Sequence, residues 1–212
     1  MVPFVDIHTH RREVLPGVVS LYSLRMGVEC CRGLTGPFWA GVHPWDCGSA
    51  DRETLDRLGL IGAAGIGEIG LDRVRGRLDE QYPWFEAQLS LAARRGLPVA
   101  LHVVRASEEA IAAVRASEVE PSRVMVHGFA GGVGLLMRYL DEGFVVSAGW
   151  RSLASARSRE ALAAVPSGRL LAETDGVGDI REVYAAVAEV RRCGVEELKE
   201  SIYDTYTRFF RL

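Results

Sequence analysis

The sequence has 212 residues, a hydrophobic fraction of 48% and a formal net charge of −3. This length suits one domain with a sizeable core, so we expect a single domain over residues 1–212. No run approaches the about 20 apolar residues of a membrane-spanning helix, and the slightly acidic balance excludes a surface that is basic throughout, as in many nonspecific nucleic-acid-binding proteins.

The beginning of the sequence and its cysteines predict a cytoplasmic protein. The first residues, "MVPFVDIHTH", lack the basic start and apolar stretch of a signal peptide. The four cysteines have no CxxC spacing, so we expect reduced thiols rather than disulfides or a zinc ribbon. We expect no membrane association, and the sequence indicates no obligate protein partner.

The first half of the chain is predicted to hold four strands and one helix. Its apolar, β-branched runs predict strands at Phe4–His8, at Val18–Leu24 with a weaker pattern, at Trp39–His43 and at Gly65–Ile69. The sequence between Arg11 and Gly36 has no clear helical pattern. Residues 79–95 have apolar positions at helical spacing and predict a helix that ends at Gly96.

The second half alternates strands and helices more regularly. Strands are predicted at Val99–His102, Val124–His127, Phe144–Ala148 and Leu170–Thr174, and helices over residues 107–116, 134–143, 179–194 and 195–210. We expect Ser107 to cap the first of these helices and glycines, among them Gly194, to end others. Such alternation predicts an α/β fold, and eight strands in about 200 residues predict a TIM-type (β/α) barrel, distorted or incomplete near its N-terminal part.

All five histidines stand at or just past the end of a predicted strand; they are His8, His10, His43, His102 and His127. The segments "GIGEIGLD" and "LLAETD" place Glu68, Glu173 and Asp175 in similar positions. The C-terminal ends of barrel strands meet at one face, so these side chains are expected to converge there. A single histidine at a strand end is more often structural than a metal ligand. A purely structural explanation, however, must hold separately for each of the five histidines. Imidazole and carboxylate ligands together suit zinc, manganese or similar ions such as magnesium.

Two pairs of residues with a spacing of two add detail to this hypothesis. Residues two apart on a strand face the same side, so His8 and His10 are predicted to bind one ion while Thr9 points away. Glu173 precedes Asp175 by the same spacing. It is a candidate hydrogen-bond partner for a ligand histidine; the alternative is a buried carboxylate paired with an arginine.

The ordered segments "DIHTH", "GVHPWD", "GEIGLD", "LPVALH", "HGFAGG" and "ETDG" resemble those of the TatD family of metal-dependent hydrolases, within the amidohydrolase superfamily. The resemblance runs through essentially the whole chain, which looks like a short-form member. It implies a TIM barrel, deoxyribonuclease activity and two divalent ions (Zn, Mn or Mg). By position it implies that His8 and His10 bind one ion and that His102 and His127 serve the second. It further implies that Glu68 bridges both ions, that Asp175 binds metal and acts on the attacking water, and that His43 contacts substrate or phosphate.

The substrate is less well defined by the sequence, which departs from the family pattern near the expected site. Arg105 follows His102 by three residues where the family often has His-x-Arg. Arg105 and Arg151 are candidate phosphate contacts, with solvated arginines as the alternative. Trp45 and Trp150 are candidates for stacking a base, with aromatic residues of the barrel rim as the alternative.

Three classes of function remain open from the sequence. The leading hypothesis is a metal-dependent phosphodiesterase that acts on DNA or a nucleotide-like substrate, with Asp175 and Glu68 as catalytic residues and a metal-activated water as nucleophile. The alternative is an amidohydrolase-type enzyme that cleaves a C–N or C–O bond of a small molecule. The third is a non-catalytic metal-binding protein, against which the intact set of candidate ligands speaks.

Overall fold

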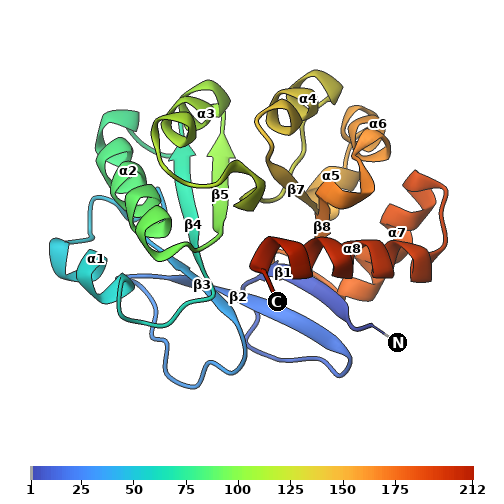
Figure 1. Cartoon of the computed structure of the whole chain (residues 1–212), viewed down its shortest axis with the longest axis horizontal. Helices are drawn as coiled ribbons and strands as arrows, with labels where there is room; N and C mark the ends of the chain where they lie inside the picture. Colours follow the sequence, from blue (N-terminus) through green and yellow to red (C-terminus); the bar gives the residue numbers. More distant parts are fainter. Residues whose placement is uncertain (1) are drawn as a thin grey trace. The chain divides into compact units, whose positions relative to one another are not determined.

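The computed structural model describes residues 2–212, and Figure 1 shows strands and helices alternating along the chain. The strands are β1 (Phe4–Thr9), β2 (Val18–Arg25), β3 (Phe38–Gly41), β4 (Gly65–Asp72), β5 (Val99–Val104), β6 (Val124–Val126), β7 (Val145–Ala148) and β8 (Leu170–Ala172). The helices are α1 (Arg52–Leu58), α2 (Leu78–Arg95), α3 (Ser107–Ala116), α4 (Val133–Asp141), α5 (Trp150–Leu153), α6 (Ala156–Ala164), α7 (Ile180–Arg191) and α8 (Val195–Phe210). Two short 3-10 helices, η1 (Pro121–Arg123) and η2 (Ser167–Arg169), lead into β6 and β8.

The eight strands form one sheet whose order, β1 to β8, follows the chain. The strand pairs β1–β2, β3–β4, β4–β5 and β7–β8 are parallel. Past the end of β8, the amide of Asp175 donates to the carbonyl of His8 in β1 at 3.0 Å, so the last strand ends beside the first. This strand order confirms the predicted α/β class and (β/α) barrel. Within residues 2–212 no helix is found between β1 and β3, where the barrel was expected to be incomplete.

The contacts within the chain divide it into two compact units. The first unit consists of Met1–Tyr22 and Val126–Leu212, and the second consists of Ser23–Met125. The prediction that residues 1–212 make a single domain stays a prediction.

In the first unit, the two C-terminal helices cover the strands at the chain's ends. Helices α7 and α8 contact β1 and β8 (Figure 1). The buried Tyr184 hydroxyl of α7 accepts a hydrogen bond from the amide of Val5 at 3.1 Å and lies 3.2 Å from the Val5 carbonyl. Val5 and Ile7 of β1 are fully buried, which fits the predicted apolar run. This packing fixes β1, the strand that carries His8.

Two helix ends differ from the prediction. Ser107 is the first residue of α3 and not its cap, because the flanking position belongs to Ala106, which makes no side-chain capping bond. Helix α7 ends at Arg191 and is capped by Arg192, two residues before Gly194. Arg192 has a left-handed φ of 54°, and its amide reaches the carbonyls of Ala188 and Glu189. Gly194 instead flanks the start of α8. None of the helices within residues 2–212 has the length and apolar character needed to cross a bilayer.

In the second unit, two buried glutamines of α2 hold the ends of neighbouring strands. The side chain of Gln88 accepts from the amide of Val42 at 2.6 Å and donates to its carbonyl at 3.1 Å. Gln81 does the same with the amide and carbonyl of Asp72, at 2.7 and 3.0 Å. A spacing of seven residues is close to two helical turns, so both side chains lie on one face of α2. At the ends of β3 and β4, the two glutamine side chains thus make the backbone hydrogen bonds that a neighbouring strand makes elsewhere in the sheet.

Replacing Gln88 by leucine is expected to lower the free energy of unfolding by about 1–3 kcal/mol, because the buried Val42 amide and carbonyl lose their partners. Urea unfolding of the purified variant measures this difference. Ser90→Ala on the exposed part of the same helix is the control, with an expected change within about 0.5 kcal/mol. Equal stability of the Gln88→Leu variant and the wild type would contradict the role of this side chain.

Candidate functional site

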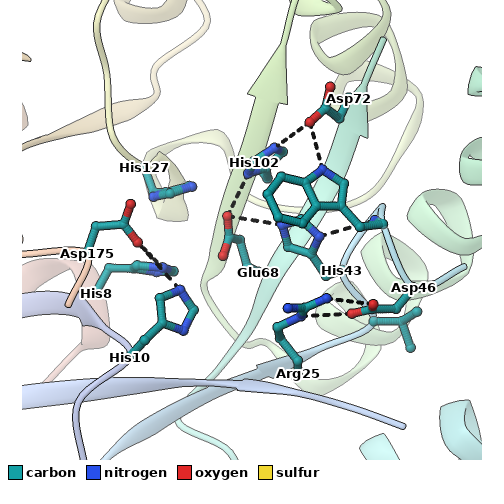
Figure 2. A network of polar contacts seen from close by, with 12 residues as sticks. His8, His10, Arg25, His43, Asp46, Glu68, Asp72, His102, His127 and Asp175 are labelled. Carbon is teal, nitrogen blue, oxygen red and sulfur yellow. Dashed lines mark hydrogen bonds and ion pairs between the residues drawn. The ribbon is translucent and has the colours of Figure 1, made fainter. Parts of the chain in front are cut away.

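The first unit gathers five candidate site residues, His8, His10, His127, Glu173 and Asp175, which we call the first cluster. Nε2 of His8 lies 3.8 Å from Oδ1 of Asp175, and Nε2 of His10 lies 3.4 Å from the same oxygen (Figure 2). The side chain of His8 is buried, whereas those of His10 and Asp175 are 35% and 32% exposed. The two histidines of the HxH pair therefore face one carboxylate that solvent and a ligand can reach.

A buried carboxylate orients the third histidine of the first cluster. Nδ1 of His127 lies 3.4 Å from Oε1 of Glu173, and the hydroxyl of Ser147 donates to the other oxygen. Burial tends to raise the pKa of Glu173, but the charges of His127 and His8 and the bonds from His127 and Ser147 hold it below its usual value. An ionised Glu173 favours the proton on Nδ1 of His127, which leaves the lone pair on Nε2, the form that binds a metal.

A second buried contact joins β1 to the end of β8, which together carry four of the five residues of the first cluster. The amide and hydroxyl of Thr174 donate to the carboxylate of Asp6 at 2.9 and 2.7 Å. Burial raises the pKa of Asp6 to about 7, although the bonds from Thr174 oppose this shift. The next residue, Asp175, has a left-handed φ of 51°. The contact therefore fixes the backbone of the β8 end from which Asp175 faces His8 and His10.

The second unit gathers His43, Glu68 and His102, which we call the second cluster. Oε1 of Glu68 lies 2.7 Å from Nδ1 of His102 and 3.4 Å from Nε2 of His43 (Figure 2). All three side chains are buried. Burial lowers the pKa of His43 even though Glu68 opposes the shift, so the neutral imidazole, which can bind metal or accept a proton, is favoured.

Asp72, at the end of β4, completes the surroundings of His102. Its Oδ2 lies 3.2 Å from Nε2 of His102 and accepts from the indole N–H of Trp45 at 2.7 Å. Burial tends to raise the pKa of Asp72, but the bonds from Trp45, His102 and the amide of Val74 hold it below its usual value. Glu68 and Asp72 thus contact opposite nitrogens of the His102 ring and set its orientation.

Glycines in "GIGEIG" allow the close approach of β4 to β5. A Cβ on Gly70, whose φ is 144°, would collide with the carbonyl oxygen of His102. A Cβ on Gly67 would lie 2.7 Å from that of Ala100. Without these glycines β4 would move away from β5, and Glu68 would lose its contact with His102.

The donor atoms of both clusters fit divalent metal ions. The ligand atoms of His8, His10 and Asp175 lie within 4.8 Å of one another, and the same holds for His43, Glu68 and His102. Each group offers two imidazoles and one carboxylate, a donor set that zinc and manganese accept. His43 therefore has a second candidate role as a ligand, beside the substrate contact predicted from the sequence.

Replacement of His43 by alanine separates these two roles. We expect the variant to keep the metal content of the wild type and to weaken substrate binding about 10- to 100-fold, the effect of losing one hydrogen bond to a charged group. Metal content per chain and the KM for a phosphodiester are the measurements. Loss of an ion from the variant would identify His43 as a ligand instead.

The two arginines predicted to contact phosphate are exposed. Arg105 follows β5 with a left-handed φ of 51°, and its carbonyl accepts from the Arg73 side chain at 2.9 Å. Arg151 belongs to α5 in the first unit. Next to it, the indole of Trp150 donates to the carbonyl of Val177 at 3.0 Å. Both side chains are exposed to solvent, and their predicted contacts with phosphate stay predictions.

Comparisons with known proteins place the chain beside a family of nucleases and hydrolases. A sequence profile described as TatD related DNase matches residues 19–211. The 3'-5' ssDNA/RNA exonuclease TatD of Enterobacter lignolyticus is 36% identical over 64% of this chain and 56% of its own length. The uncharacterized metal-dependent hydrolase YjjV of Escherichia coli is 28% identical over 68% of this chain and 62% of its own length. The matches thus span less than two thirds of these relatives.

Solved structures share the fold over nearly the whole chain. The crystal structure of Escherichia coli YjjV, a TatD homologue, has a TM-score of 0.84 at 22% identity and covers 99% of this chain and 98% of its own. A TatD family hydrolase from Entamoeba histolytica has a TM-score of 0.81 at 16% identity, with 98% and 97% covered. At such identities the likeness concerns the fold, and it agrees with the barrel seen here.

Proposed function

Since the chain belongs to the TatD related DNase family, we propose that it is a metal-dependent phosphodiesterase that cleaves single-stranded nucleic acid. The observation that carries this proposal is the gathering of imidazole and carboxylate groups in each unit, with His8, His10 and Asp175 in the first and Glu68 and His102 in the second. The exonuclease named among the relatives supports the choice of substrate class.

The proposed metal ligands are those predicted from the sequence: His8, His10, Glu68, His102, His127 and Asp175. Their imidazole groups favour zinc, and their carboxylates also accept manganese or magnesium, for two ions in all. Bound divalent ions supply the electrophile of the reaction, because they lower the pKa of water and polarise a phosphoryl oxygen. The bridging of both ions by Glu68 stays a prediction.

The side chains of the first cluster have different proposed roles in catalysis. Asp175 is partly exposed and faces both His8 and His10, so its carboxylate can orient an attacking water and accept its proton. Glu173 is buried and cannot reach substrate; it holds the imidazole of His127. In the second unit, Asp72 holds the imidazole of His102 in the same way.

Arg105 and Arg151 are proposed to stabilise the negative charge that develops on the phosphoryl oxygens. Replacing either by alanine is expected to lower phosphodiester turnover about 10- to 1000-fold, with unchanged metal content. The rates are measured on a short single-stranded oligonucleotide, with Arg94→Ala on the exposed side of α2 as the control. Undiminished cleavage by both variants would remove these arginines from the mechanism.

A substrate panel tests the proposed function against its alternative. The protein is assayed with zinc, manganese and magnesium on a single-stranded oligonucleotide, a phosphomonoester, a neutral amide and a lactone. We expect oligonucleotide cleavage that weakens as salt rises, because phosphate contacts release counterions. Turnover of the amide or lactone without oligonucleotide cleavage would instead identify an amidohydrolase acting on small molecules, which needs only polarisation of one carbonyl.

A further inference from the structure

One aromatic side chain next to the second cluster is both rigidly held and exposed. Trp45 is 43% exposed, whereas His43 and His102 beside it are buried. Its indole N–H donates to Asp72 at 2.7 Å, and its amide donates to Nδ1 of His43 at 3.1 Å. The ring centroid of Trp45 lies 4.6 Å from that of His43 and 5.6 Å from that of His102. The indole is therefore fixed beside two candidate site residues before any ligand arrives.

Two arginines lie over the Trp45 ring, and they are held differently. Arg25 lies 5.9 Å from the ring centroid and is paired through two hydrogen bonds with Asp46, at 2.6 and 2.9 Å (Figure 2). The guanidinium of Arg75 stacks at 4.6 Å, and Arg75 is exposed. An exposed arginine on an aromatic face gains little in water, so a flat ligand can displace its guanidinium at low cost.

We propose that Trp45 is the stacking platform for one nucleobase of a single-stranded substrate. The base takes the place of the Arg75 guanidinium on the indole, and Arg75 turns to the phosphate backbone. Aromatic side chains stack all four bases, and such stacking adds affinity for single strands without base-specific hydrogen bonds. This inference rests on the proposed nuclease function. It adds that the second unit recognises a nucleobase of the substrate.

The test compares substrates that differ only in their bases. One is a single-stranded oligothymidylate, and the other has the same backbone with abasic residues at its three 3'-terminal positions. We expect the wild type to have a kcat/KM about 5- to 150-fold higher on the base-bearing strand, the range of one stacked base. Binding of phosphorothioate versions, followed by fluorescence anisotropy, is expected to show the same preference without turnover.

Two replacements of Trp45 separate stacking from the hydrogen bond to Asp72. Trp45→Phe keeps an aromatic face but loses the N–H donor, and we expect it to retain most of the preference for bases. Trp45→Gln keeps a donor but loses the ring, and we expect the two strands to become equivalent. Arg75→Ala is the companion variant: it frees the indole face of the guanidinium, so we expect the preference for the base-bearing strand to be retained or raised.

The outcomes distinguish this inference from the proposed function. Cleavage of both strands by the wild type with equal kcat/KM would overturn the stacking role and leave the nuclease function standing. A preference for bases that survives in Trp45→Gln would also overturn it. Failure of the wild type to cleave either strand with zinc, manganese or magnesium would overturn the nuclease function and the inference together.

Discussion

Replacing Asp175 by asparagine is expected to lower phosphodiester turnover by at least about 100-fold, the scale of losing a general base. The amide keeps the size of the side chain and an oxygen that faces His8 and His10, but it cannot accept a proton from water. Because the carboxylate is partly exposed, we expect the fold and most of the bound metal to remain. Steady-state rates, metal content and the thermal unfolding midpoint of the same preparation measure the three quantities.

Asp179→Asn is the matched control for this variant. Asp179 lies four residues further on and caps α7 by accepting from the amide of Arg181. Asparagine caps helices about as well as aspartate, so the control is expected to have wild-type rates and stability. If Asp175→Asn kept its metal and more than a tenth of the wild-type rate, Asp175 would not be the general base.

Glu68→Gln is expected to remove bound metal and to lower turnover by at least about 100-fold. Changes in residues that only support a ligand already cost about 10- to 100-fold in metal affinity or activity, and Glu68 itself is a proposed ligand. Its buried carboxylate contacts both His43 and His102, so the neutral amide also removes the one charge that these imidazoles share. Metal per chain and turnover are the measurements.

The number of ions lost from Glu68→Gln tests the predicted bridging role. Loss of both ions supports a carboxylate shared between them, whereas loss of one assigns Glu68 to a single ion. Glu86→Gln on the exposed face of α2 is the control and is expected to keep metal and rate. Full metal content together with undiminished turnover would show that Glu68 is not a ligand.

The strands could be predicted from the sequence because each is an apolar run that is buried in the structure. The end of β3 could not, because Val42 satisfies its backbone through Gln88, a residue distant in the sequence. The short helices α1, α5 and α6 were not predicted from the sequence either. Helices of this length are marginal by themselves and depend on packing, and α6 is polar over much of its surface, with Ser155 as its cap.

The candidate ligands could be predicted because histidines and carboxylates at strand ends converge in a barrel. The residues that position these ligands were harder to identify from the sequence. Asp6, Asp72 and Ser147 lie on strands and look like isolated polar residues in apolar runs. Their roles depend on which side chain each one reaches, and only the structure shows the contacts of Asp72 with His102 and of Ser147 with Glu173. The pair of Glu173 with His127 was among the alternatives left open by the sequence.

The most direct test of the account is the dependence of strand cleavage on bound metal. The protein is stripped of metal by a chelator and titrated with zinc, manganese or magnesium while release of nucleotides from a labelled single-stranded oligonucleotide is followed. We predict no cleavage by the metal-free protein and full activity at two ions per chain, the stoichiometry of two-metal phosphodiesterases. Full cleavage by protein that holds no metal would contradict the account.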